Sequence, residues 1–165
     1  MTMKNLVLLL STVSTALIGG LFYAYSCSVL PGLTRLNDLS FLQAMQSINR
    51  AILNPLFFIS FMGTLILLPV CTWLFYEKNT SLLFYLLLAA ALLYAGGVFL
   101  VTMVGNVPLN DILDGASLEK MNANELSALR NKFEPAWNLY HSIRTVISCL
   151  CIVILAYAAL ISRTT

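Results

Sequence analysis

Apolar residues are concentrated in four long segments of the chain, and polar residues lie between them. The segments cover about residues 6–30, 55–76, 82–104 and 141–161. A helix needs about 20 mostly apolar residues to cross a bilayer, and each segment meets that length. The pattern therefore predicts an all-α protein in which four transmembrane helices form a bundle.

The first segment also has some features of a signal peptide. Lys4 precedes the apolar run, and Ala24-Tyr25-Ser26 resembles a small-x-small cleavage site. The apolar run nevertheless continues through Leu30, before Pro31-Gly32 ends it. We therefore interpret this segment as the first transmembrane helix.

The connections between the segments differ in length. Residues 77–81 predict a tight helical hairpin, whereas residues 31–54 and 105–140 form long connections. Because consecutive spans alternate in direction, both long connections lie on one side of the membrane, which we name the loop face. Residues 38–53 and 117–132 have amphipathic patterns, which predict short helices at the membrane interface in both long connections.

The composition also favours a chain embedded in lipid. The 165 residues are 59% hydrophobic and 10% charged, whereas soluble domains carry roughly 25% charged residues. We expect one integral membrane domain over residues 1–165, surrounded by the lipid bilayer. The net charge of +2, without a run of lysine or arginine, argues against a nucleic-acid partner. Pairs of small residues at Gly19-Gly20 and Gly96-Gly97 predict close helix contacts and would permit a homo-oligomer.

Three polar stretches border the loop face, over residues 43–54, 105–111 and 137–145. In a four-helix bundle these helix ends converge, and polar groups at membrane depth are costly unless they pair or serve a site. Helical spacing places Trp137, His141 and Arg144 on one face of the last segment. We predict that the three stretches form one polar cluster, with these members: Gln46, Asn49, Arg50, Asn106, Asn110, Asp111, Trp137, Asn138, His141 and Arg144.

His141 is the only histidine of the chain, so it is the side chain best suited to transfer protons near neutral pH. Arg144 and Arg50 could each hold an anion or a carbonyl oxygen, and Arg50 could instead pair with Asp111. The sequence predicts no metal centre, because it has one histidine, no clustered carboxylates in the spans and no thiolate pair. Haem ligation by His141 stays open, as does a purely structural role in which the cluster caps the bundle through hydrogen bonds.

Several of these residues also carry a family resemblance. The matching groups are Gly20–Ala24 with Ser28–Pro31, Met45–Arg50 with Asn54–Pro55, Gly105–Asp111, and Trp137–Asn138 with His141, Arg144 and Thr145. In this order they resemble the anthrone-oxygenase-like integral membrane family, most of whose bacterial members have no assigned function. The resemblance implies a multi-pass protein of the bacterial inner (plasma) membrane. It also implies an oxygenase that needs no cofactor and turns an anthrone into an anthraquinone.

Under this hypothesis the partners are a lipophilic aromatic substrate and dioxygen. His141 would remove a proton as general base, and Arg144, Asn106 or Asn110 would stabilise the resulting oxyanion. Trp137 would stack on the rings of the substrate. The remaining members of the cluster would contact the substrate: Asn138, Gln46, Asn49, Arg50 and Asp111.

Two other classes of function compete with the oxygenase hypothesis. A non-catalytic protein that binds a lipid, a quinone or another small ligand, or a partner subunit, would use the same polar cluster. A transporter is less favoured, because the polar residues inside the spans are mainly serine and threonine and form no charged path.

Overall fold

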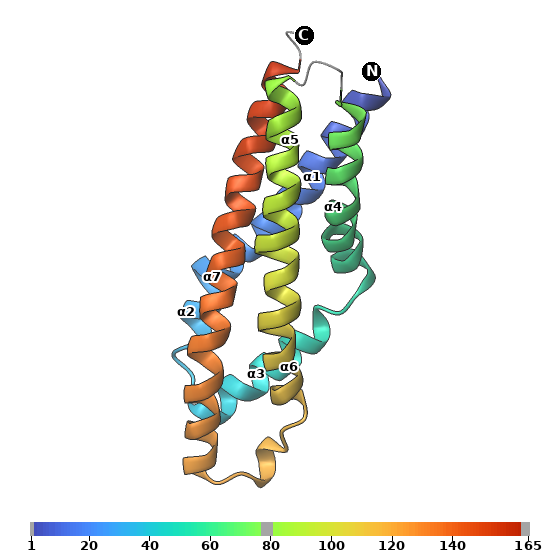
Figure 1. The fold of residues 1–165 in the computed structure, drawn as a ribbon. Coiled ribbons are helices and arrows are strands. Elements are labelled where there is room, and N and C mark those ends of the chain that lie inside the picture. The colour runs from blue at the N-terminus through green and yellow to red at the C-terminus, as the bar shows by residue number, and fades with distance from the viewer. Residues whose placement is uncertain (1, 77–80, 163–165) are drawn as a thin grey trace.

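The computed structural model describes residues 2–76 and 81–162. Within these residues, four helical units are long and apolar enough to cross a membrane, which confirms the predicted all-α bundle. Figure 1 shows the four units side by side, with the start of the first and the end of the last at the same end of the bundle.

Two of the four units combine several helical elements. The first joins α1 (Met3–Ala24), the π-helical segment η1 (Tyr25–Val29) and α2 (Leu30–Leu33). The second is α4 (Pro55–Leu74). The third joins α5 (Leu82–Leu93), the π-helical segments η2 (Tyr94–Leu100) and η3 (Thr102–Asn106), and α6 (Val107–Asp114). The fourth is α7 (Ala123–Ile161).

Both long connections lie at the other end of the bundle, as the alternation of spans predicted (Figure 1). The first contains α3 (Asp38–Ala51), which confirms the amphipathic helix expected over residues 38–53. The second contains only the 3₁₀ turn η4 (Leu118–Lys120) between α6 and α7. The hairpin predicted over residues 77–81 lies outside the described residues, except for Ser81.

The helices extend further toward the loop face than the apolar pattern predicted. The separate helix expected over residues 117–132 is wrong, because residues 123–132 are the first turns of α7. A capping box begins α7: the Asn122 side chain accepts from the backbone N–H of Glu125, and the Glu125 carboxylate accepts from the N–H of Asn122. With its first N–H groups satisfied in this way, α7 starts well outside the apolar segment.

The buried apolar side chains form two clusters along the bundle. The first fills the space among α1, α4, α5 and α7 and includes Leu68, Leu87 and Leu155. The second lies among α3, α6 and α7 and includes Leu42 and Leu113. Both clusters reach α7, so the polar residues of its middle turns lie where the two clusters meet.

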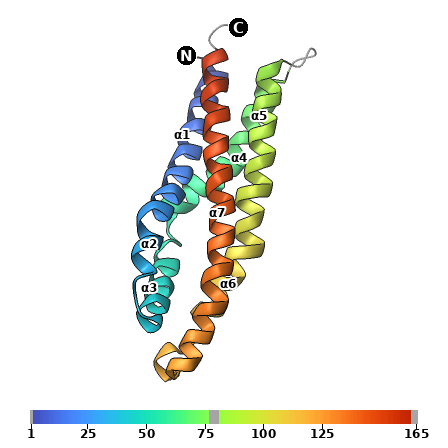
Figure 2. The same ribbon diagram turned by 90° about the vertical axis from the view of Figure 1, so that its left-hand side faces the viewer.

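Arg130 ties the beginning of α3 to α7. Its guanidinium donates to the backbone oxygens of Leu36, at 2.8 Å, and Thr34, at 3.2 Å. It also forms ion pairs with Asp38 and Glu134. Figure 2 shows the result, with α2 and α3 together at the loop-face end of the bundle. α3 therefore covers the loop-face end of the space between the spans.

Close approach of α7 to the third unit requires glycine at two positions. A Cβ atom on Gly105 would lie 2.6 Å from the Tyr140 ring, and a Cβ on Gly97 would overlap the Ile147 side chain. Gly96, next in the chain, has open space around it. The Gly96-Gly97 pair therefore supports a close helix contact through one of its members only.

Candidate functional site

His141 lies at the centre of the polar cluster and is almost fully buried, with 1% of its surface exposed. Its Nε2 atom is 2.9 Å from the Ser26 hydroxyl, and its Nδ1 atom is 3.3 Å from the Arg144 guanidinium. The ring stacks on Trp137, with 5.0 Å between ring centroids. Tyr25 approaches it edge-on at 5.3 Å. Both ring nitrogens therefore have protein partners, and the aromatic neighbours fix the plane of the ring.

Arg144 is buried one turn further from the loop face, and no ion pair to it is found among the described residues. The guanidinium contacts the faces of Phe22, at 4.5 Å, and Trp137, at 5.3 Å. One of its terminal nitrogens lies 3.4 Å from the Thr102 hydroxyl. Its Nε atom is buried without a hydrogen-bond partner. A cation held this way has donor capacity left for an oxygen atom of a ligand.

The asparagines of the cluster form a second polar group beside Trp137. Asn110 Oδ1 accepts from the Trp137 indole N–H at 2.8 Å and from Asn49 at 3.0 Å. Asn106 donates to the backbone oxygen of Trp137, while its Oδ1 atom is buried without a partner. Asn106 Oδ1 and Arg144 Nε thus offer one free acceptor and one free donor, and an unmade hydrogen bond in a buried site costs about 1–3 kcal/mol.

These side chains line one cavity of about 150 Å³. Its other walls are apolar and come from α1, α3, α4 and η3, including Leu21, Ile48, Phe57 and Phe61. An apolar cavity of about 150 Å³ is large enough for one benzene ring. A ligand with several fused rings therefore reaches the polar end with one ring and extends outward with the others.

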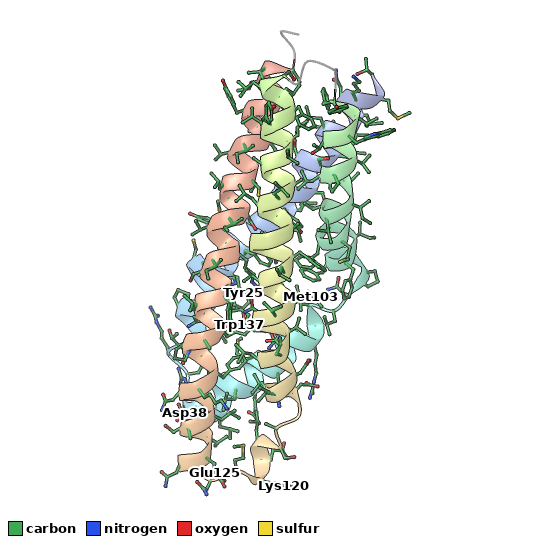
Figure 3. All side chains as sticks on the ribbon, in the orientation of Figure 1. Tyr25, Asp38, Met103, Lys120, Glu125 and Trp137 are labelled. Atoms are coloured by element: carbon green, nitrogen blue, oxygen red, sulfur yellow. The ribbon has the colours of Figure 1, made fainter. Side chains whose placement is uncertain are left out.

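Four of the side chains that line this cavity are exposed, and one of them is Leu21 on α1, at 39%. The other three are Leu53, Phe58 and Met103, which are at least 44% exposed. They lie between the beginning of α4 and η3, on the flank of the bundle. Figure 3 shows Met103 on that flank, and Tyr25 and Trp137 deeper in the bundle. The cavity thus opens sideways, toward the bilayer in a membrane-spanning bundle, and has its polar groups at the closed end.

π-Helical segments supply part of the site on two opposite sides. Tyr25 and Ser26 lie in η1, while Thr102 and Asn106 lie in η3. A π-helical turn contains an extra residue, shifts the side chains that follow, and occurs frequently at functional sites. Ser26 of η1 contacts His141, and Thr102 of η3 contacts Arg144.

The structure brings some of the predicted cluster into the cavity and leaves the rest outside. The cavity lining contains these predicted residues: Asn49, Asn106, Asn110, Trp137, His141 and Arg144. Gln46 instead donates to the backbone oxygens of Leu113 and Ala116, which joins α3 to α6 and its following turn. Asn138 and the exposed Asp111 do not line the cavity.

Arg50 is exposed and forms its ion pair with Asp114, so the suggested pairing with Asp111 is wrong. Asp114 lies about one helical turn beyond Asp111 on α6, and the sequence could not fix the register of α6 against α3. This ion pair lies on the surface of the bundle, and neither of its side chains lines the cavity.

Several site residues were missed by sequence reasoning. Phe22, Tyr25, Ser26 and Thr102 were not among the predicted members of the cluster. Helical spacing did hold a signal for them, because Phe22 continues the buried face of α1 that contains Thr15 and Ile18. Ser26 follows Phe22 by four residues, and Thr102 follows the buried Val98 by four. Among the described residues, no three histidine, cysteine, aspartate or glutamate side chains gather closely enough to hold a metal ion.

Comparisons with known proteins add one finding. A protein-family model described as anthrone oxygenase matches residues 56–154, a stretch that contains Asn106, Trp137, His141 and Arg144. No curated protein and no solved structure matches the chain.

The burial of Arg144 gives a testable prediction for stability. Burying a cation without an ionic partner costs free energy, and an apolar side chain of similar length avoids that cost. We expect Arg144→Met to raise the melting temperature of the detergent-purified protein in thermal unfolding. Arg35→Met, which removes an exposed arginine of the loop face, is the control and should change it little. A clear fall in the melting temperature of Arg144→Met would show that the guanidinium stabilises the fold.

Proposed function

Because the chain belongs to the anthrone oxygenase family, we propose that it oxygenates a lipophilic aromatic ketone of the anthrone type to a quinone, with dioxygen as oxidant. The observation that supports this most is the composition of the closed end of the cavity. There, His141 contacts a terminal nitrogen of Arg144, while Arg144 Nε and Asn106 Oδ1 are buried without partners. A ligand that presents an oxyanion would use the free donor, and a neighbouring hydroxyl would use the free acceptor.

In the proposed reaction, His141 removes a proton from the acidic methylene of the substrate, and the electron pair of the C–H bond delocalises onto the ketone oxygen. Arg144 stabilises this oxyanion, because a preorganised donor in a water-poor site interacts strongly with developing charge. Trp137 and the aromatic walls hold the flat rings. The electron-rich carbanion then reduces dioxygen, and a bond forms between carbon and oxygen.

The proposed reaction balances without a further reductant. The peroxide takes the proton back from His141, which then removes the second methylene proton as the O–O bond breaks. The carbon becomes a carbonyl, and the departing hydroxide takes that second proton to form water. One methylene group and one dioxygen molecule thus give one carbonyl group and one water molecule. The route proposed here uses no metal or flavin.

A non-catalytic ligand-binding protein is the second candidate. Both ring nitrogens of His141 already have hydrogen-bond partners, as in a structural cluster. In that case the same cavity binds a quinone or another flat polar aromatic and releases it unchanged. Ligand would then raise the melting temperature by mass action without any turnover.

Dioxygen uptake distinguishes the two candidates. With a panel of anthrones, the detergent-purified protein should consume one dioxygen per quinone formed. His141→Gln should lower kcat by at least about 100-fold, the lower end of what a general base contributes, and Arg144→Met should lower it as well. Arg35→Lys, on the exposed loop face, should behave like wild type. Uptake that persists in His141→Gln would contradict the role of the base, and no uptake by the folded wild type would favour the binding protein.

The sideways opening predicts how the substrate reaches the site. Met103→Trp places a bulky side chain at the opening, so the KM for a three-ring substrate should rise several-fold while kcat changes less. Val104→Trp is the matched control, because Val104 is 64% exposed and does not line the cavity. If both variants have the same KM as wild type in reconstituted vesicles, the substrate does not enter between α4 and η3.

A further inference from the structure

The donor and the acceptor of each hydrogen bond around His141 follow from the chemistry of the groups involved. A guanidinium only donates hydrogen bonds, so the Arg144 nitrogen 3.3 Å from Nδ1 requires Nδ1 to be an acceptor. Neutral imidazole carries one proton, which must then be on Nε2. Nε2 consequently donates to the Ser26 hydroxyl, 2.9 Å away.

The hydrogen bonds of Ser26 and Thr145 are consistent with a proton on Nε2. The Thr145 hydroxyl donates to the backbone oxygen of His141 at 2.8 Å, and a carbonyl oxygen can only accept. Because the Thr145 hydroxyl already donates its proton to that carbonyl, Thr145 Oγ1 can accept from the Ser26 hydroxyl, 3.4 Å away. Ser26 then has a lone pair for the Nε2 proton. Each hydroxyl donates once and accepts once, and the chain ends on a backbone carbonyl.

From this polarity we infer that the hydroxyl pair of Ser26 and Thr145 holds His141 in the tautomer protonated at Nε2, so that Nδ1 is the atom that receives the proton of the substrate. Arg144 by itself imposes the same tautomer in the free protein. The hydroxyl pair becomes decisive when a ligand oxygen binds Nε and also draws the terminal nitrogen of Arg144 away from Nδ1, because Nδ1 then loses its donor. Ser26 and Thr145 are thus positioning residues that act through His141.

The catalytic consequence rests on the proposed oxygenase function. When Arg144 binds the ketone oxygen through both Nε and the terminal nitrogen that had contacted His141, Nδ1 becomes free to take the methylene proton. The C–H bond then breaks, an N–H bond forms at Nδ1, and the electron pair stays on the substrate. A proton at Nδ1 beside the guanidinium would bring two cations together. It is therefore held there only while the substrate anion lies between them, which couples proton removal to stabilisation of the anion.

Nitrogen NMR tests the tautomer without any assay of activity. Because the chain has a single histidine, ¹⁵N-histidine labelling of the untagged protein in detergent gives signals from one imidazole alone. We expect a protonated, pyrrole-type Nε2 and an unprotonated, pyridine-type Nδ1 in wild type. We expect the same two signals in Arg144→Met, where the hydroxyl pair and the backbone carbonyl of Phe22 are left to fix the proton. A protonated Nδ1 in either protein would overturn the inference.

Removing the hydroxyl pair tests its role directly. In the Arg144→Met background, Ser26→Ala with Thr145→Val should move both signals toward the average of two exchanging tautomers. Ser28→Ala in the same background is the matched control, since Ser28 is an exposed serine of the same π-helical segment. Signals of the triple variant identical to those of Arg144→Met would overturn the role of the pair. If the triple variant does not fold, the wild-type and Arg144→Met spectra still decide the direction of the network.

Kinetics then separate this inference from the proposed function. In otherwise wild-type protein, Ser26→Ala should lower kcat for anthrone oxygenation by about 10- to 100-fold with little change in KM, and Ser26→Thr should restore most of the rate. An unchanged kcat in Ser26→Ala would overturn the catalytic part of the inference. Absence of turnover in wild type would refute the oxygenase, while the spectra would still report the tautomer.

Discussion

The burial of the Arg144 guanidinium, without an ion pair among the described residues, is the constraint on which the site depends. A cation at that depth is tolerable only if other groups replace part of its hydration. Here these are the ring faces of Phe22 and Trp137, the hydroxyl of Thr102 and Nδ1 of His141. Each group comes from a helix that must stay in place for the cation to be stabilised. The same arrangement leaves Nε without a partner, so the site is completed best by an oxygen of a ligand.

The rest of the architecture provides the surroundings that such a charge needs. α3 covers the loop-face end of the bundle, and Arg130 and Gln46 hold α3 against α7 and α6. Apolar side chains fill the other walls of the cavity, and the opening faces the flank of the bundle. A polar end closed off from water and an apolar opening toward lipid suit a flat ligand that dissolves in the bilayer and carries a few oxygen atoms.

The sequence predicted the bundle and about half of the site for identifiable physical reasons. Four apolar segments specify four spans, and i, i+4 and i+7 spacing places Trp137, His141 and Arg144 on one face of a helix. Spacing says nothing about the register between helices, so it offered Asp111 as one possible partner of Arg50, whereas the structure pairs Arg50 with Asp114. It also assumes regular α-helices. Ser26 and Thr102 lie in the π-helical segments η1 and η3, and they contact His141 and Arg144.

Tryptophan fluorescence can show whether the cluster around His141 and Arg144 binds a flat aromatic ligand. The chain has two tryptophans: Trp137 lines the cavity, and Trp73 is 73% exposed on α4. Trp73→Phe leaves Trp137 as the only reporter, and Trp137→Phe leaves Trp73 as the control for partitioning into detergent. With a hydroxylated anthraquinone as ligand, the account predicts saturable quenching of Trp137 that Arg144→Met abolishes, and non-saturable quenching of Trp73. Quenching of Trp137 that never saturates and is unaffected by Arg144→Met would contradict it.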